Sequence, residues 1–225
     1  MNMDAKPTTS WDACLPEMKL DGLQPVFSPS GDVDKARQLA ADRKLIRRSE
    51  KAVVLDARRL ANCITFLGRL PAKNESFHCI TEKNFAMCHV VPATLTLAAP
   101  ATITYLGIST LSFSQANMVD LLAMLDRGQI GTIDMAYSIY FKSNEKENCQ
   151  RLAHELTGRG CRVFSGLVHS KILLLELTDG RKFSVESSAN LRSCASIENL
   201  SMFSDPTLFA FHREWLDSLF TEAKK

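Results

Sequence analysis

Residues 163–190 read VFSGLVHSKILLLELTDGRKFSVESSAN, and this stretch decides the fold of the chain. Ile172 to Leu175 are four apolar residues in succession, which is typical of a β-strand buried on both faces. Thr178 to Arg181 contains the Asp-Gly pair of a tight hairpin turn, and Lys182 to Glu186 is expected to return as the partner strand. Val163 to Val168 predicts a further strand just before. The stretch therefore predicts neighbouring strands of a sheet that is covered on both sides.

The sequence before this stretch alternates between strand and helix patterns. Thr102 to Ser112 and Thr132 to Phe141 are rich in β-branched and aromatic residues, which favours strands. Between them, a polar cap residue, apolar residues at helical spacing and a glycine stop predict a helix: Asn117, Met118, Leu121, Leu122, Leu125 and Gly128. A second helix is predicted by a capping box and an apolar stripe: Asn144, Glu147, Cys149, Leu152, Ala153 and Leu156. Because this alternation indicates βαβ units, we expect an α/β protein with a parallel or mixed sheet flanked by helices.

Two further segments flank this alternation. The region from Phe77 to Ala98 is short and strand-like, and it ends in apolar residues. Near the C-terminus, Asp205 and Pro206 mark the start of an amphipathic helix. Its inner stripe is expected to contain Leu208, Phe211, Trp215 and Leu219.

The N-terminal part of the chain differs in composition from the rest. Residues 1–31 are rich in proline and show no helical or strand period, which is typical of an arm that is flexible or packs on a partner. Residues 32–48 and 49–67 favour two helices, so we expect an arm at 1–31, a basic helical segment at 32–70 and the main domain at 71–225. The cations of the helices suit either a solvated face or a surface that follows phosphates: Arg43, Lys44, Arg47, Arg48, Lys51, Arg58 and Arg59.

Composition narrows the class of protein without choosing a function. The chain has 225 residues, 45% apolar and 23% charged, and its net charge of +2 is too small to argue for nucleic acid on its own. No apolar run approaches the roughly 18 residues needed to cross a bilayer, and the first residues do not follow the pattern of a signal peptide. The seven scattered cysteines are expected to be reduced thiols, so a cytoplasmic protein without membrane contact is predicted.

Polar residues stand at the ends of the two hairpin strands. His169 and Lys171, just before the buried strand, are two residues apart and share a face if the strand period holds. On their own they would be an ordinary surface pair. Ser188 and Asn190 follow the return strand with the same spacing, and hairpin geometry is expected to bring them alongside His169 and Lys171. Glu198 comes next, ahead of another apolar strand.

These residue types suit phosphodiester chemistry. A neutral histidine can attack phosphorus when a carboxylate, here Glu198, fixes its tautomer. Lys171, Ser188 and Asn190 can stabilise negative charge on the non-bridging oxygens of the phosphoryl group. The chemistry that we expect of these side chains needs no metal or other cofactor.

The order of these residues resembles the signature of the phospholipase D superfamily, which is H-x-K-x4-acid, then S-x-N, then E-N before an apolar strand. The likeness in element order extends over residues 101–220, and its specific part is residues 169–199. The resemblance implies that His169 forms a phosphohistidine and that Glu198 hydrogen-bonds this histidine. It also implies that the phosphate is bound by Lys171, Ser188 and Asn190, and that residues 71–225 form a phospholipase D-like catalytic domain.

The sequence departs from the family pattern at two positions. Glu176 stands where the family has an aspartate, and Ser187 stands where it usually has a glycine. The aspartate position is largely structural in the family, so Glu176 is expected to serve as the structural acid of the motif. Both departures are compatible with a weakened enzyme.

The resemblance also implies a second copy of the chain. The family mechanism uses two histidines, one that attacks and one that protonates the leaving oxygen. This chain has one such motif, so a C2 homodimer is predicted to join two copies of His169 in one composite site. Short single-motif relatives are typically dimeric nucleases, which implies a DNA endonuclease here. The candidate DNA contacts are then Arg43, Lys44, Arg47, Arg48 and Lys51.

Other interpretations stay open at this point. A degenerate member would bind nucleic acid without cutting it, and a lipid phosphodiesterase or phosphatidyl transferase would use the same chemistry on another substrate.

The pairs His78-Cys79 and Cys88-His89 contain metal-ligating residue types. Adjacent residues of a strand face opposite ways, however, and the spacing matches no common zinc pattern, so no metal site is expected.

Overall fold

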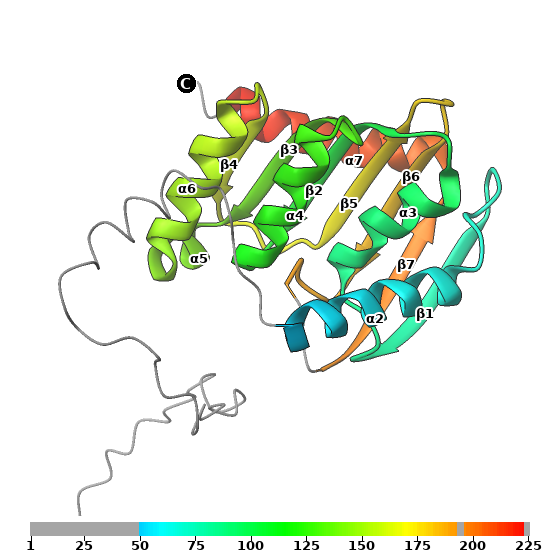
Figure 1. The fold of residues 1–225 in the computed structure, drawn as a ribbon. Coiled ribbons are helices and arrows are strands. Elements are labelled where there is room, and N and C mark those ends of the chain that lie inside the picture. The colour runs from blue at the N-terminus through cyan, green and yellow to red at the C-terminus, as the bar shows by residue number, and fades with distance from the viewer. Residues whose placement is uncertain (1–49, 193–195, 223–225) are drawn as a thin grey trace, which may run out of the picture. The chain divides into compact units, whose positions relative to one another are not determined.

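The computed structural model describes residues 50–192 and 196–222, with side chains from Asp56 to Thr221 outside the same gap. The described residues form a seven-stranded mixed sheet with the strand order β1-β7-β6-β5-β2-β3-β4 (Figure 1). Its strands are β1 (Ser76–Glu82), β2 (Ile103–Thr110), β3 (Ile130–Ser138), β4 (Arg162–Gly166), β5 (Ile172–Leu177), β6 (Lys182–Ser187) and β7 (Ile197–Phe203). The pairs β2-β3 and β3-β4 are parallel, whereas the other neighbours are antiparallel. The predicted α/β class with a mixed sheet is confirmed.

Helices cover both faces of the sheet. In Figure 1, α2, α3, α4 and α6 lie across one face and α7 lies behind the other. The helices are α2 (Glu50–Leu67), the 3-10 turn η2 (Met87–His89), α3 (Val90–Ala98), α4 (Gln115–Asp126), α5 (Ile139–Asn144), α6 (Lys146–Thr157) and α7 (Pro206–Glu222). The larger core lies under α2 to α6 and includes the buried free thiols of Cys63 and Cys149. None of the helices in the described ranges is long and apolar enough to cross a membrane.

The buried hairpin forms as its sequence predicts. Leu173, Leu174 and Leu175 of β5 are completely buried. Because neighbouring side chains of a strand face opposite ways, Leu173 and Leu175 enter the larger core while Leu174 packs under α7. Gly180 closes the turn with φ +85°, a left-handed conformation that glycine adopts without strain.

The prediction of a strand-like segment up to Ala98 is wrong in its second half. The chain leaves β1 at Glu82 and forms η2 and then α3, which is the apolar run VVPATLTLA. Its buried residues include Val90, Val91 and Ala98. A run that is apolar almost throughout shows no period, so it does not distinguish a buried helix from a strand. Pro92 is compatible with the helix because it lies in the first turn, where no intrahelical N–H is needed.

Two predicted helix caps are also wrong. Ser114, not Asn117, caps α4, since its hydroxyl accepts a hydrogen bond from the Asn117 N–H at 3.2 Å. The Asn117 side chain accepts one in return from the Ser114 N–H at 2.9 Å, which completes a reciprocal capping box. Asn144 ends α5, so it does not cap α6.

The buried stripe of α7 lies one position further along the helix than predicted. Phe209, Leu216 and Phe220 are buried, whereas the side chain of Phe211 is 65% exposed. His212 completes the stripe, and its Nε2 lies 2.8 Å from Oε1 of Glu186. A histidine can replace an apolar residue on a buried stripe when it finds a polar partner. Trp215 and Leu219 of the predicted stripe are partly buried against the same core, so the prediction is wrong by one position and fails most clearly at Phe211.

Candidate active site

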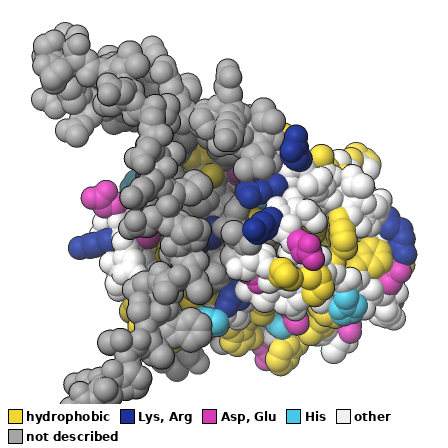
Figure 2. Space-filling view, turned by 90° about the horizontal axis from the view of Figure 1, so that it is seen from below, with side chains coloured by type: hydrophobic (Ala, Val, Ile, Leu, Met, Phe, Trp, Pro, Cys, Tyr) yellow, Lys and Arg dark blue, Asp and Glu magenta, His cyan; other side chains and the backbone are white. Residues whose placement is uncertain are grey.

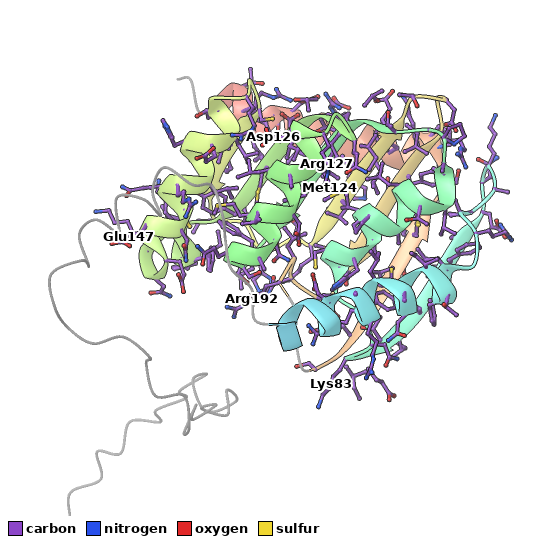
Figure 3. All side chains as sticks on the ribbon, in the orientation of Figure 1. Lys83, Met124, Asp126, Arg127, Glu147 and Arg192 are labelled. Atoms are coloured by element: carbon purple, nitrogen blue, oxygen red, sulfur yellow. The ribbon has the colours of Figure 1, made fainter. Side chains whose placement is uncertain are left out.

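The residues of the predicted motif lie at one end of the sheet. His169 and Lys171 precede β5, Ser188 and Asn190 follow β6, and Glu198 lies near the start of β7. Since β5, β6 and β7 are antiparallel neighbours, the start of β5, the end of β6 and the start of β7 meet at the same end. Arg192, which follows the Asn190 segment, is labelled at the lower end of the sheet in Figure 3.

The side chains of His169 and Lys171 lie together. The Lys171 ammonium is 3.1 Å from Nδ1 of His169 and donates a hydrogen bond to the carbonyl oxygen of the same residue at 2.7 Å. His169 is exposed and Lys171 is half-buried. Burial lowers the pKa of the Lys171 ammonium, and the negative charge of Glu198 partly opposes this shift. An exposed imidazole therefore lies beside a partly desolvated cation, and this cation also interacts with the carboxylate of Glu198.

Ser188 and Glu198 form the second part of the site. The Ser188 hydroxyl donates a short hydrogen bond to Oε2 of Glu198 and accepts one from the Asn199 N–H at 3.0 Å. The sequence predicted instead that Glu198 would hydrogen-bond His169. Within the part of the chain that the structure describes, this carboxylate accepts a hydrogen bond from Ser188, and the contact with His169 stays a prediction.

The register of the hairpin differs from the one expected at this end. Ile172 pairs with Glu186, and the Ser187 N–H donates to the Lys171 carbonyl at 3.1 Å. Ser187, not Ser188, therefore lies opposite Lys171, and a continued ladder would place Ser188 on the other face. The strand ends at Ser187, and Ser188 bonds to β7. Ser188 therefore reaches Glu198 because the chain leaves the β5-β6 ladder after Ser187 and pairs with β7, not because of the hairpin register.

Asn190 has an unusual side-chain environment. Its Oδ1 is buried and has no hydrogen-bond partner among the residues that the structure describes. The next residue is held firmly, because the Leu191 N–H donates to Oγ1 of Thr110 at 3.0 Å. Buried polar atoms without a partner are uncommon in folded proteins and often mark functional positions. The group of this amide that could bind a phosphate oxygen is its Nδ2 donor, not the unpaired Oδ1.

The other predicted residues lie elsewhere. Glu176 is near the far end of β5, where its carboxylate lies 3.1 Å from the Lys182 ammonium on the neighbouring strand. This cross-strand ion pair gives the motif acid a structural contact away from His169. The side chains of the candidate DNA contacts lie outside the described residues: Arg43, Lys44, Arg47, Arg48 and Lys51.

The histidines outside the motif make separate local contacts. His78 hydrogen-bonds Ser201 across β1 and β7 at 2.8 Å. His89 is buried, and its Nε2 lies 3.1 Å from Oδ1 of Asp56. Within residues 50–192 and 196–222, no group of three or more histidine, cysteine or acidic side chains is arranged to hold a metal ion.

Two features of this end were not predicted. The first is a pair of buried hydroxyls at the end of β2, Ser109 and Thr110, which bond to the motif segments. The second is a set of exposed apolar side chains in β1, at the start of α5, in the loop before His169 and at the start of β7, here called the apolar rim: Ile80, Ile139, Tyr140, Leu167 and Ile197. Figure 2 views the molecule from below, and hydrophobic side chains gather on the described part of that face near histidine and cationic side chains. Neither feature has a local sequence pattern, since both depend on which segments the sheet brings together.

Comparison by sequence finds no matching family model and no matching curated protein. Comparison by structure finds polyphosphate kinase from Porphyromonas gingivalis, with a TM-score of 0.51 and 13% identity over 69% of this chain. The match spans 28% of that kinase. NucT from Helicobacter pylori has a TM-score of 0.49 and 13% identity, with 64% of this chain and 96% of NucT covered. Nuc from Salmonella typhimurium, a phospholipase D family member, has a TM-score of 0.49 and 13% identity, with 65% of this chain and 94% of Nuc covered. The fold is thus one that part of a polyphosphate kinase shares.

Proposed function

We propose that this chain is a phosphodiesterase of the phospholipase D superfamily that cleaves nucleic acid, most simply DNA. The observation that carries the proposal is the arrangement at the ends of β5, β6 and β7. His169 and Lys171 lie together there, and Glu198 lies close enough to affect the Lys171 charge while it binds Ser188. The spacing of these residues matches the superfamily signature, and the α/β fold agrees with it.

The proposed reaction has two displacements at phosphorus. A ring nitrogen of His169 attacks the phosphodiester, a P–N bond forms, and the bond to the leaving oxygen breaks. The leaving oxygen takes a proton from a second imidazole. Water then attacks the phosphohistidine, the second imidazole accepts the proton of the water, and the P–N bond breaks. Lys171 and Asn190 stabilise the non-bridging oxygens in both steps. These side chains supply the complete sequence of steps without a metal ion.

The second imidazole in this proposal is the partner subunit's His169. The other described histidines are bonded elsewhere or lie on other elements, as with His78, His89 and His212. The apolar rim supports a second copy at this end, because Leu167 is 83% exposed two residues before His169 and Ile197 is 69% exposed next to Glu198. Exposed apolar side chains that surround a site commonly mark an interaction surface. A C2 dimer would cover the rim and complete the site.

Cleavage of single- and double-stranded DNA with excess EDTA tests the proposal. Wild type is expected to release products, and His169→Ala is expected to release none. His154→Ala is the matched control, because His154 is an exposed histidine on α6. DNA binding without products from wild type would show instead a degenerate binding member. Turnover of phospholipid vesicles but not of DNA would show that the same chemistry acts on a lipid substrate. The exposed apolar side chains of the rim are compatible with contact with lipid.

A further inference from the structure

The last two residues of β2 reach both segments of the motif. Ser109 Oγ lies 2.5 Å from Oγ of Ser170, the residue between His169 and Lys171. Thr110 Oγ1 accepts the hydrogen bond from the N–H of Leu191, the residue after Asn190. Ser109 is 1% exposed and Thr110 is completely buried, so water does not compete for either hydroxyl.

Strand geometry explains how two neighbouring residues can serve two segments. Side chains of adjacent strand residues point to opposite faces, so Ser109 and Thr110 reach in opposite directions from one strand end. The residues that they reach, Ser170 and Leu191, are 21 residues apart in sequence, and both lie outside the strand ladders. Thr110 is anchored in turn, because its hydroxyl donates to the Ser112 carbonyl at 2.9 Å.

We propose that Ser109 and Thr110 are positioning residues that fix the His169–Lys171 segment and the Asn190 segment relative to each other. This inference rests on the proposed function, since it assigns the two hydroxyls to the same site. Neither hydroxyl touches the phosphate. Each holds a loop whose geometry the sheet does not fix, and a displacement of about 1 Å in such a loop can lower a rate about 100-fold.

The described chain contains matched controls for both positions. Thr110→Val removes the hydroxyl and keeps the shape, while Thr110→Ser keeps the hydroxyl. Thr94→Val makes the same change at a completely buried threonine whose hydroxyl has no partner among the described residues. Ser109→Ala is matched by Ser184→Ala for the same reason, since Ser184 is also completely buried and its hydroxyl has no described partner.

The experiment measures kcat and KM on bis(4-nitrophenyl) phosphate, a small diester that needs no extended binding surface, at a temperature where every variant is folded. Thr110→Val is expected to lose kcat by about 10- to 100-fold with KM little changed, because a displaced loop misplaces groups needed in the transition state. Thr110→Ser and the two control variants are expected to stay close to wild type. Ser109→Ala is expected to lose kcat to a smaller extent.

The outcomes separate this inference from the proposed function. Equal kcat in wild type, Thr110→Val and Ser109→Ala would overturn the positioning role and leave the phosphodiesterase standing. A wild type without turnover would refute the proposed function. The affinity for inorganic phosphate would then decide the positioning role: a loss in Thr110→Val but not in Thr94→Val supports it, whereas equal or undetectable binding in all variants overturns it.

Discussion

The ammonium of Lys171 lies 3.1 Å from Nδ1 of His169 while it donates to the carbonyl of that same residue. The lysine is thus already held against the proposed nucleophile before any substrate arrives. A phosphoryl oxygen that enters the site would meet a cation whose position is fixed and whose hydration is incomplete. Lys171→Met is therefore expected to lower diester turnover by about 100- to 1,000-fold, the usual loss for one charge-stabilising donor.

The matched control for that change is Lys142→Met. Lys142 is an exposed lysine of α5 that hydrogen-bonds Ser165 at 3.2 Å. If the Lys142 variant lost as much turnover as the Lys171 variant, general positive charge and not a positioned ammonium would explain the effect.

Glu198 is expected to control the pH range in which Lys171 is charged. Burial lowers the pKa of Lys171, and Glu198 raises it. Glu198→Gln removes the opposing charge, so the pKa should fall further and the ammonium should lose its proton at a lower pH. Phosphate binding is expected to be lost as the pH rises and Lys171 loses its proton. In Glu198→Gln this loss should begin at a lower pH than in wild type. An unchanged or upward-shifted limit would contradict this electrostatic coupling.

Asn190 is expected to be required for activity and to lower the stability of the fold. Its buried Oδ1 has no partner among the described residues, and such an atom costs about 1–3 kcal/mol when it is left unsatisfied. Asn190→Leu removes this cost with a side chain of similar size. We expect diester turnover to fall sharply while the melting temperature stays level or rises. A clear fall in melting temperature would show that the amide is mainly structural.

The ion pair between Arg162 and Asp134 is expected to contribute to stability. Arg162 Nε donates to Oδ1 of Asp134 at 2.8 Å, and the Asp134 side chain is only 4% exposed. Arg162→Ala would leave that carboxylate buried without its cation, which should lower the free energy of unfolding by about 3 kcal/mol in urea titrations. Arg181→Ala, which breaks an exposed pair with Asp179, should cost less than about 1 kcal/mol. Similar losses in the two variants would argue against the role of burial.

The apolar rim is expected to hold the dimer together. Leu167→Asp places a charge on the rim, so sedimentation should show monomers, and DNA cleavage should fall because the second imidazole is lost. Phe211→Asp is the control, since Phe211 is 65% exposed on α7 and does not belong to the rim. A Leu167→Asp protein that cleaves DNA as a monomer would refute the composite site.

The two halves of the motif illustrate how far sequence reasoning reaches. The spacing of His169 and Lys171 predicted neighbouring side chains, and the structure brings them together. The same reasoning aligned Ser188 with them by hairpin register, yet Ser187 occupies the position opposite Lys171. The turn sequence predicts that a hairpin forms. It does not predict where the β5-β6 ladder stops, because that depends on the hydrogen bonds that Ser188 makes with Asn199 and Glu198 of β7.

By itself, the sequence determined the features that depend on neighbours along the chain. These are the alternation of strands and helices, the doubly buried strand β5, the turn at Gly180 and the spacing of the motif residues. Tertiary structure alone decided the helical state of α3, the side chains that α7 buries most deeply, the carboxylate that accepts the Ser188 hydrogen bond, and the contacts of Ser109 and Thr110. The physical reason is the range of the interactions: periodicity and turn chemistry act over a few residues, whereas a buried hydrogen bond or a packed face depends on partners that lie 10 to 81 residues away in the chain.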